Sequence, residues 1–90
     1  MQVNGLEIGP GAHLPNADLS GTDLSNVDLT GADLMHANLR KTNLTHANLT
    51  NAHMSGANLS GADITGANMT GADLSGATMP DGKMHKKTHA

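Results

Sequence analysis

The sequence contains no cysteine and no aromatic residue, and each absence excludes a class of protein. Without cysteine there is no disulfide framework, no thiolate metal site and no thiol nucleophile. Without Phe, Trp or Tyr, and with only 11 Leu, 2 Ile and 2 Val among 90 residues, the chain cannot fill a conventional globular core. Charged residues are also few, 14% with a formal net charge of −3, so the charge density of a disordered chain is missing too. Small residues must therefore build the interior.

Long apolar runs and targeting signals are absent as well. No run approaches the roughly 18 residues of a membrane span, and the start, Met1 to Gly5, lacks a basic region followed by an apolar one. We therefore expect no signal peptide and a cytoplasmic protein, or a virion protein if the chain derives from a phage. The mildly negative net charge favours neither direct nucleic-acid binding nor a membrane surface.

What the sequence does contain is a repeat with a period of five. A Leu-type residue marks each of fourteen units, with Ala two residues before it in eleven units and Asp or Asn between them in eleven. Ser or Thr follows the Leu-type residue in ten units, and the fifth position is Gly in seven. The Leu-type residues form a predicted core ladder: Leu14, Leu19, Leu24, Leu29, Leu34, Leu39, Leu44, Leu49, Met54, Leu59, Ile64, Met69, Leu74 and Met79.

A period of five fits neither an α-helix nor a long strand. On a helix the Leu-type positions would wander around the whole circumference, and the frequent Gly would oppose helix formation. Within a unit, alternation points Ala inward, Asp or Asn outward and Leu inward. The Ser/Thr-Gly pair then changes the chain direction, because Gly accepts the positive φ of tight turns. The pattern predicts short extended faces joined by turns, which stack if the chain coils.

These units resemble the pentapeptide repeat family, whose signature is Ala-(Asp/Asn)-Leu-x-x, and the resemblance covers residues 12–81. The resemblance implies an all-β fold, a right-handed quadrilateral parallel β-helix (a pentapeptide repeat solenoid) with four units per coil and about three and a half coils. Residues twenty apart support such a coil. One outward column would contain His13, Asp33, His53 and Asp73, and one inward column Thr22, Thr42 and Ala62.

The two ends depart from the repeat. Residues 1–11 are predicted to form an N-terminal cap over the first coil with Val3, Leu6 and Ile8. Residues 82–90 are predicted to form a degenerate last unit, in which Met84 keeps the five-residue phase, followed by a disordered basic tail at residues 86–90. With no capping helix there, we expect the C-terminal end to be the more exposed one, and end-to-end self-association is a hypothesis for it.

The His/Asp column offers one candidate site. Two His beside an Asp have the donor types that zinc or another transition metal prefers. The alternative is a solvent-exposed ladder without metal, which we favour because a flat face converges poorly on one ion. We therefore predict no metal and no cofactor.

A second candidate is a set of bulky and basic residues at the turns of the second coil. We call this set the corner belt; it comprises Met35, His36, Arg40, Lys41 and His46. The preceding coil is acidic, with Asp18, Asp23, Asp28 and Asp33 at its outward positions. Large side chains that interrupt a smooth repeat indicate a surface that docks a partner protein; the alternative is a solvated face without a partner.

The function that these features favour is not catalytic, because no nucleophile, base and acid come together in the pattern. We predict a non-enzymatic structural or protein-interaction module, a rigid scaffold within a larger assembly such as a phage particle or a bacterial complex. The alternative comes from the resemblance. The quinolone-resistance pentapeptide repeat proteins mimic DNA and bind DNA gyrase, and the acidic residues of the first coil would stand for phosphates here. The low net charge, the basic corner belt and the short body speak against that alternative.

Overall fold

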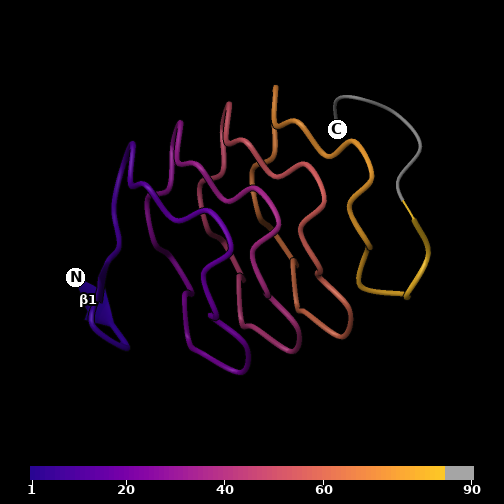
Figure 1. The fold of residues 1–90 in the computed structure, drawn as a ribbon, viewed down its shortest axis with the longest axis horizontal. Coiled ribbons are helices and arrows are strands. Elements are labelled where there is room, and N and C mark those ends of the chain that lie inside the picture. The colour runs from indigo at the N-terminus through magenta and orange to yellow at the C-terminus, as the bar shows by residue number, and fades with distance from the viewer. Residues whose placement is uncertain (85–90) are drawn as a thin grey trace.

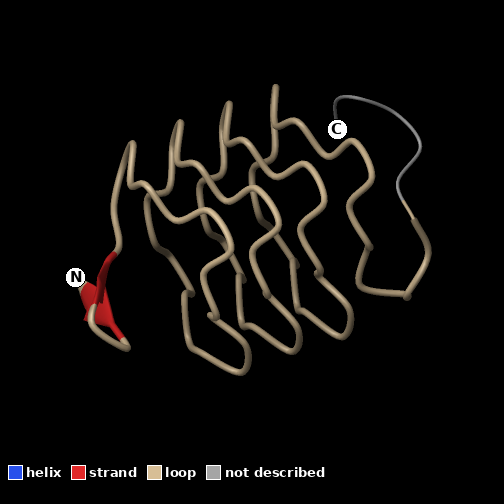
Figure 2. Cartoon of the chain, in the orientation of Figure 1, coloured by secondary structure: helices blue, strands red, loops and turns tan. Residues whose placement is uncertain are grey.

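The computed structural model of the chain describes residues 1–84. It opens with a small antiparallel hairpin of strands β1 (Gln2–Val3) and β2 (Leu6–Glu7), seen at the N-terminal end in Figures 1 and 2. The hairpin pairs Gln2 with Glu7 and Val3 with Leu6, and the Ile8 amide closes it by donating to the Met1 carbonyl oxygen at 2.7 Å. This hairpin leads into the repeat.

From the repeat onward the chain winds in coils that stack side by side along the long axis of the molecule (Figure 1). Isolated parallel bridges join each outward middle residue to the residue twenty positions later, from His13 with Asp33 to Asn58 with Thr78. One turn of the stack therefore takes four five-residue units. The result is a β-helix-like repeat fold, and the molecule measures 31 × 24 × 22 Å along its principal axes.

The coils pair through single residues, because the flat part of each unit is only Ala-Asx-Leu. Each bridge has two backbone hydrogen bonds: the Leu14 amide donates to the Asp33 carbonyl oxygen at 2.7 Å, and the Asp33 amide donates to that of Ala12 at 2.8 Å. A third bond joins the turns, from the Asn16 amide to the Met35 carbonyl oxygen at 2.8 Å. Most backbone hydrogen bonds thus run between coils, which satisfies the polar main chain without continuous strands.

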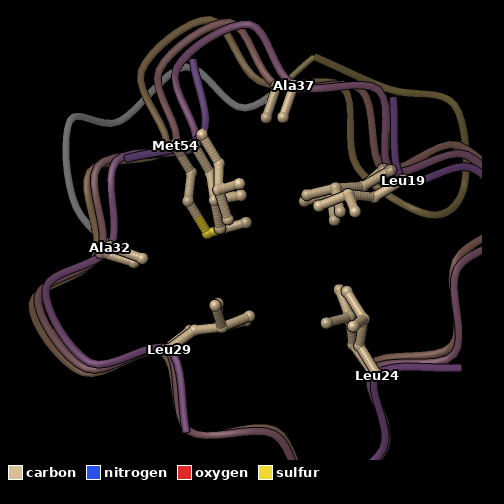
Figure 3. Close-up of a cluster of buried hydrophobic side chains, with 14 of the residues drawn as sticks. Leu19, Leu24, Leu29, Ala32, Ala37 and Met54 are labelled. Carbon is tan, nitrogen blue, oxygen red and sulfur yellow. The ribbon is translucent and has the colours of Figure 1, made fainter. Parts of the chain in front are cut away.

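The interior is a column of Leu-type side chains with Ala beside them. Figure 3 shows Leu19, Leu24, Leu29 and Met54 pointing into one shared space. The core ladder is buried from Leu14 to Leu59 and again at Leu74. At about 1.5–3 kcal/mol for each buried side chain, this column supplies the main apolar driving force. The coil is narrow enough for Leu and Ala to fill it, so the fold needs no aromatic residue.

The stack is closed differently at its two ends. At the N-terminal end Ile8 is buried and two hairpin residues, Val3 and Leu6, pack against the core. At the C-terminal end Ile64, Met69 and Met79 of the core ladder are only partly buried. The more exposed apolar edge of the described chain is therefore the C-terminal one.

Met84 does not take the inward place that the five-residue phase assigns to it. The positive φ moves from the expected fifth position, Asp81, to Gly82, and the Met79 amide then donates to the Lys83 carbonyl oxygen at 2.7 Å. This turn sends the chain back, so that Met84 pairs antiparallel with Thr78 and is 63% exposed. The predicted tail, residues 86–90, lies outside the described residues. No helix within residues 1–84 has the length and hydropathy that crossing a bilayer requires.

Candidate functional site

The outward Asp and Asn side chains are part of the turns. Asp18 Oδ1 accepts a hydrogen bond from the Ser20 backbone amide at 3.1 Å and another from the Ser20 hydroxyl at 2.7 Å. The same pair of bonds recurs around the coils, for example from Thr45 to Asn43 at 3.0 and 2.8 Å. This Asx turn explains why Asp or Asn is followed two residues later by Ser or Thr. This turn was not predicted, although these residue types at that spacing are its signal.

The fifth residue of each unit is in the left-handed region of backbone conformation. Its φ is positive at every fifth position from Asn16 to Gly76, with values near 60–70°. Gly adopts this conformation without penalty and Asn tolerates it, whereas other L-residues are disfavoured by about 1–2 kcal/mol. The corner belt places His36, Lys41 and His46 there, with φ of 58°, 57° and 59°. These three positions therefore store backbone strain.

The other two corner-belt residues remove half of an Asx turn. Met35 and Arg40 stand where most units have Ser or Thr, so no hydroxyl reaches the preceding side chain. Only their backbone amides donate, to Asp33 Oδ1 at 3.1 Å and to Asn38 Oδ1 at 3.2 Å. Each substitution forgoes a hydrogen bond worth about 0.5–1.5 kcal/mol.

The corner belt is exposed, and three of its side chains lie across glycines of the following coil. The His36 ring occupies the place that a Cβ on Gly56 would take, and the His46 ring does the same at Gly66. Lys41 Cγ lies 3.2 Å from the corresponding point on Gly61. The next coil thus accommodates these side chains because it has glycine at these turns.

Arg40 and Lys41 lie together at one turn of the second coil, with the Ser20–Gly21 turn on one side and the Ser60–Gly61 turn on the other. With Ser20, Gly21 and Asn38 they line an open hollow of about 290 Å³. Neither cation forms an ion pair within residues 1–84, where the ion pairs are those of the N-terminal amine with Glu7 and of His13 with Asp33. The hollow therefore presents two positive charges to solvent.

The acidic coil next to this hollow stays ionised. Donation by the Ser20 hydroxyl, and then by its backbone amide, holds the pKa of Asp18 below its ordinary value. The Ser25 and Thr30 hydroxyls and amides lower the pKa of Asp23 and of Asp28 in the same way. A band of carboxylates and a band of cations thus lie one coil apart, about 4.8 Å in a stacked sheet.

The His/Asp column lies on one face, as its spacing predicted. Bridges join His13 to Asp33, Asp33 to His53 and His53 to Asp73. His13 Nδ1 lies 3.4 Å from Asp33 Oδ2, and the His13 side chain is 81% exposed. Within the described part of the chain, no three side chains of His, Cys, Asp or Glu are grouped so that they could hold a metal ion.

A family model places the chain among known proteins. The model described as pentapeptide repeats matches in eight copies, over residues 11–40 and 42–79. The chain belongs to the pentapeptide repeat family, whose members are typically non-enzymatic. No curated protein matches it significantly.

Three solved structures are similar to the chain. HetL of the cyanobacterium Nostoc, a pentapeptide repeat protein involved in regulating heterocyst differentiation, is 36% identical, with 83% of this chain and 50% of HetL covered and a TM-score of 0.41. A thylakoid-lumen pentapeptide repeat protein of Arabidopsis thaliana is 37% identical, with 80% and 54% covered and a TM-score of 0.39. Another Nostoc pentapeptide repeat protein is 36% identical, with 76% and 64% covered and a TM-score of 0.36. The chain thus spans about half to two thirds of the length of these proteins.

Proposed function

We propose that the chain is a non-enzymatic scaffold that presents the corner belt to a partner protein. In this proposal the coils form a right-handed quadrilateral β-helix of about three and a half coils, which needs no cofactor. The observation that carries the proposal is the Arg40–Lys41 corner. There, two cations without an ion pair among residues 1–84 replace the Ser-Gly pair found one coil earlier at Ser20–Gly21 and one coil later at Ser60–Gly61.

The stability lost at the corner belt supports a binding role. Lys41 has a positive φ where Gly21 and Gly61 occupy the same column without strain, and Arg40 lacks the hydroxyl of Ser20 and Ser60. Strained residues that the rest of a structure holds in place are concentrated at functional sites. If this face only contacted solvent, the Ser-Gly pair of the neighbouring coils would be the more stable choice at these positions. A binding role gives a reason for the less stable Arg-Lys pair.

The setting that we propose is a larger assembly, such as a bacterial complex or a phage particle, in the cytoplasm or in a virion. The exposed C-terminal end is a second proposed contact, with another copy of the chain, because Met84 is 63% exposed there and three core-ladder residues are only partly covered. Light scattering over a concentration series tests this contact. Growth of the mass beyond the monomer supports it, and a constant monomer mass contradicts it.

The scaffold role is tested by affinity capture from the source cells with quantitative mass spectrometry. The bait is the wild-type chain, and the comparison bait contains Arg40→Ser and Lys41→Gly, which restore the pattern of the neighbouring coils. Lys83→Gln is the matched control, because it removes a cation that lies away from the corner belt. Partners that depend on Arg40 and Lys41 but not on Lys83 are expected. An identical set of partners for all three baits contradicts the proposal.

One feature, the acidic first coil, supports the alternative function of DNA mimicry. Asp18, Asp23 and Asp28 are exposed and ionised, but the next coil is basic, which breaks the run of negative charge that a duplex presents. A DNA gyrase supercoiling assay with and without the protein distinguishes the two functions. Neither inhibition nor protection of gyrase is expected if the chain is a scaffold of the proposed kind.

A further inference from the structure

We infer that the hollow at Arg40 and Lys41 binds the side-chain carboxylates of an acidic segment in the partner protein. This inference rests on the proposed function and names the chemistry of the partner. The hollow is open to solvent, and Arg40 and Lys41 at its wall are exposed and form no ion pair among the described residues.

The donors in the hollow match a carboxylate. The planar Arg40 guanidinium can present two parallel N–H groups to the two oxygens of a carboxylate, and the Lys41 ammonium adds a point charge beside it. Of the other polar groups of the wall, Asn38 Oδ1 accepts from the Arg40 backbone amide at 3.2 Å, and two further donors are engaged within the fold. The Ser20 hydroxyl donates to Asp18 at 2.7 Å, and the Gly21 amide donates to the Arg40 carbonyl oxygen at 2.9 Å. Recognition therefore depends on the two cations.

The surrounding charges limit the length and direction of the ligand. Asp18 and Asp23 lie in the preceding coil, and Asp63 lies in the following one. Each of these carboxylates lies one coil away, about 4.8 Å along the stack, on the faces beside the column of Arg40 and Lys41, whose own neighbours are Ser20–Gly21 and Ser60–Gly61. A long anionic chain that crossed these faces would meet the carboxylates. A short segment that runs around the second coil instead stays on the corner belt, where His36 and His46 occupy the neighbouring turns.

The same limits disfavour nucleic acid. A duplex has one negative charge per roughly 1.7 Å of its axis, so it would extend over the acidic coil in most orientations. Single strands bind largely by stacking of bases on aromatic side chains, and this chain has none. Carboxylates on a short peptide segment can reach the two cations without extending over the acidic coil, and their binding requires no aromatic side chain.

The test measures the binding of a fluorescent oligoglutamate peptide to the intact chain by anisotropy, at low and at physiological ionic strength. The proteins are the wild type, Arg40→Ser, Lys41→Gly, the double variant and the Lys83→Gln control. Binding that weakens with salt is expected, with a loss of affinity of about tenfold or more in the double variant, since each charged hydrogen bond contributes substantially. Lys83→Gln is expected to bind like the wild type.

Two results overturn the inference. One is equal oligoglutamate affinity, or no binding at all, for the wild type and the double variant. The other is an oligothymidylate that binds more tightly than oligoglutamate and loses affinity through the same substitutions. In either case, cellular partners that still require Arg40 and Lys41 would leave the scaffold proposal standing with a partner of other chemistry. Circular dichroism of each variant checks that the fold is retained.

Discussion

The hydroxyl of Thr42 donates a hydrogen bond of 2.8 Å to the carbonyl oxygen of Leu19, which lies in the preceding coil. The Thr22 hydroxyl donates to the same oxygen at 2.6 Å. Thr42 is fully buried, and this bond satisfies its only side-chain polar group. One carbonyl oxygen thus links two coils through two side chains of a single inward column, and the Ala62 position of that column lacks the link.

Replacing Thr42 by Val tests the value of this link. The shape of the side chain is kept while the hydroxyl is lost, and Leu19 retains the bond from Thr22. We expect the free energy of unfolding to fall by about 0.5–1.5 kcal/mol. Denaturant titration measures it. An increase in the free energy of unfolding would show that the desolvation of the Thr42 hydroxyl destabilises the fold by more than its hydrogen bond stabilises it.

Gly56→Ala tests the packing of the corner belt on the next coil. A Cβ at Gly56 would meet the His36 ring, in addition to the strain of about 1–2 kcal/mol that a positive φ imposes on Ala. Gly76 is the matched control, because it lies in the same column with φ of 69° and nothing within 4 Å of a Cβ. We therefore expect Gly56→Ala to lower the unfolding free energy more than Gly76→Ala does.

The variant His36→Gly separates the two causes in this comparison. With the ring removed, Gly56→Ala should cost only as much as Gly76→Ala, because the backbone penalty alone remains. Denaturant titration of the four proteins of this double-mutant cycle gives the coupling energy. A coupling energy of zero would mean that the His36 ring does not rest on Gly56.

Arg40→Ser with Lys41→Gly should stabilise the protein. The new Ser hydroxyl can donate to Asn38 Oδ1, as the Ser20 hydroxyl does to Asp18, which adds about 0.5–1.5 kcal/mol. Gly relieves the positive φ of Lys41, partly offset by its greater freedom in the unfolded chain, for a net gain of about 0.5–1 kcal/mol. A higher thermal midpoint than that of Lys83→Gln is the expected result. A lower one would refute the view that the corner belt is strained.

Acid should weaken the first coil before the second. The folded pKa of Asp18, Asp23 and Asp28 is lowered by hydrogen bonds, so their stabilising effect is complete above the unfolded value, about 3.9. It is lost as the pH falls through the lower, folded pKa. The corresponding residues of the second coil are Asn, whose turns do not titrate.

A triple variant with Asn at positions 18, 23 and 28 tests this dependence. Its thermal midpoint should decline less than that of the wild type when the pH is lowered from neutral into the acid range. Calorimetry at a series of pH values measures both declines. Parallel curves for the two proteins would show that these three carboxylates do not contribute.

The five-residue repeat could be predicted because its period can be counted directly in the sequence. Leu at every fifth position identifies the repeat. The twenty-residue register was expected from the family resemblance, with columns such as His13 and Asp33 in support, and the bridges show that register. The strain at Lys41 was not predicted: the pattern places the turn at the fifth position, but only the structure shows that Lys41 keeps the positive φ of the Gly units there. Met84 departs from the phase because Gly82, rather than Asp81, takes the left-handed conformation.

The candidate site was predictable only as a list of irregular residues. That Arg40 and Lys41 border one hollow, and that His36 leans over Gly56, depends on how coils lie on each other. These contacts are made between residues about twenty positions apart, and they depend on the directions in which the side chains point. The residue types alone do not specify those directions. The corner belt as a binding surface stays a prediction.

We propose that Arg40 and Lys41 serve binding and that they make the fold less stable than a Ser-Gly pair would. The most direct measurement is the affinity of the Arg40→Ser/Lys41→Gly double variant for oligoglutamate, relative to that of the wild type, in a sample whose unfolding free energy is also known. We predict an affinity lower by about tenfold or more in a protein that is more stable than the wild type. An unchanged affinity in a folded double variant would contradict the claim.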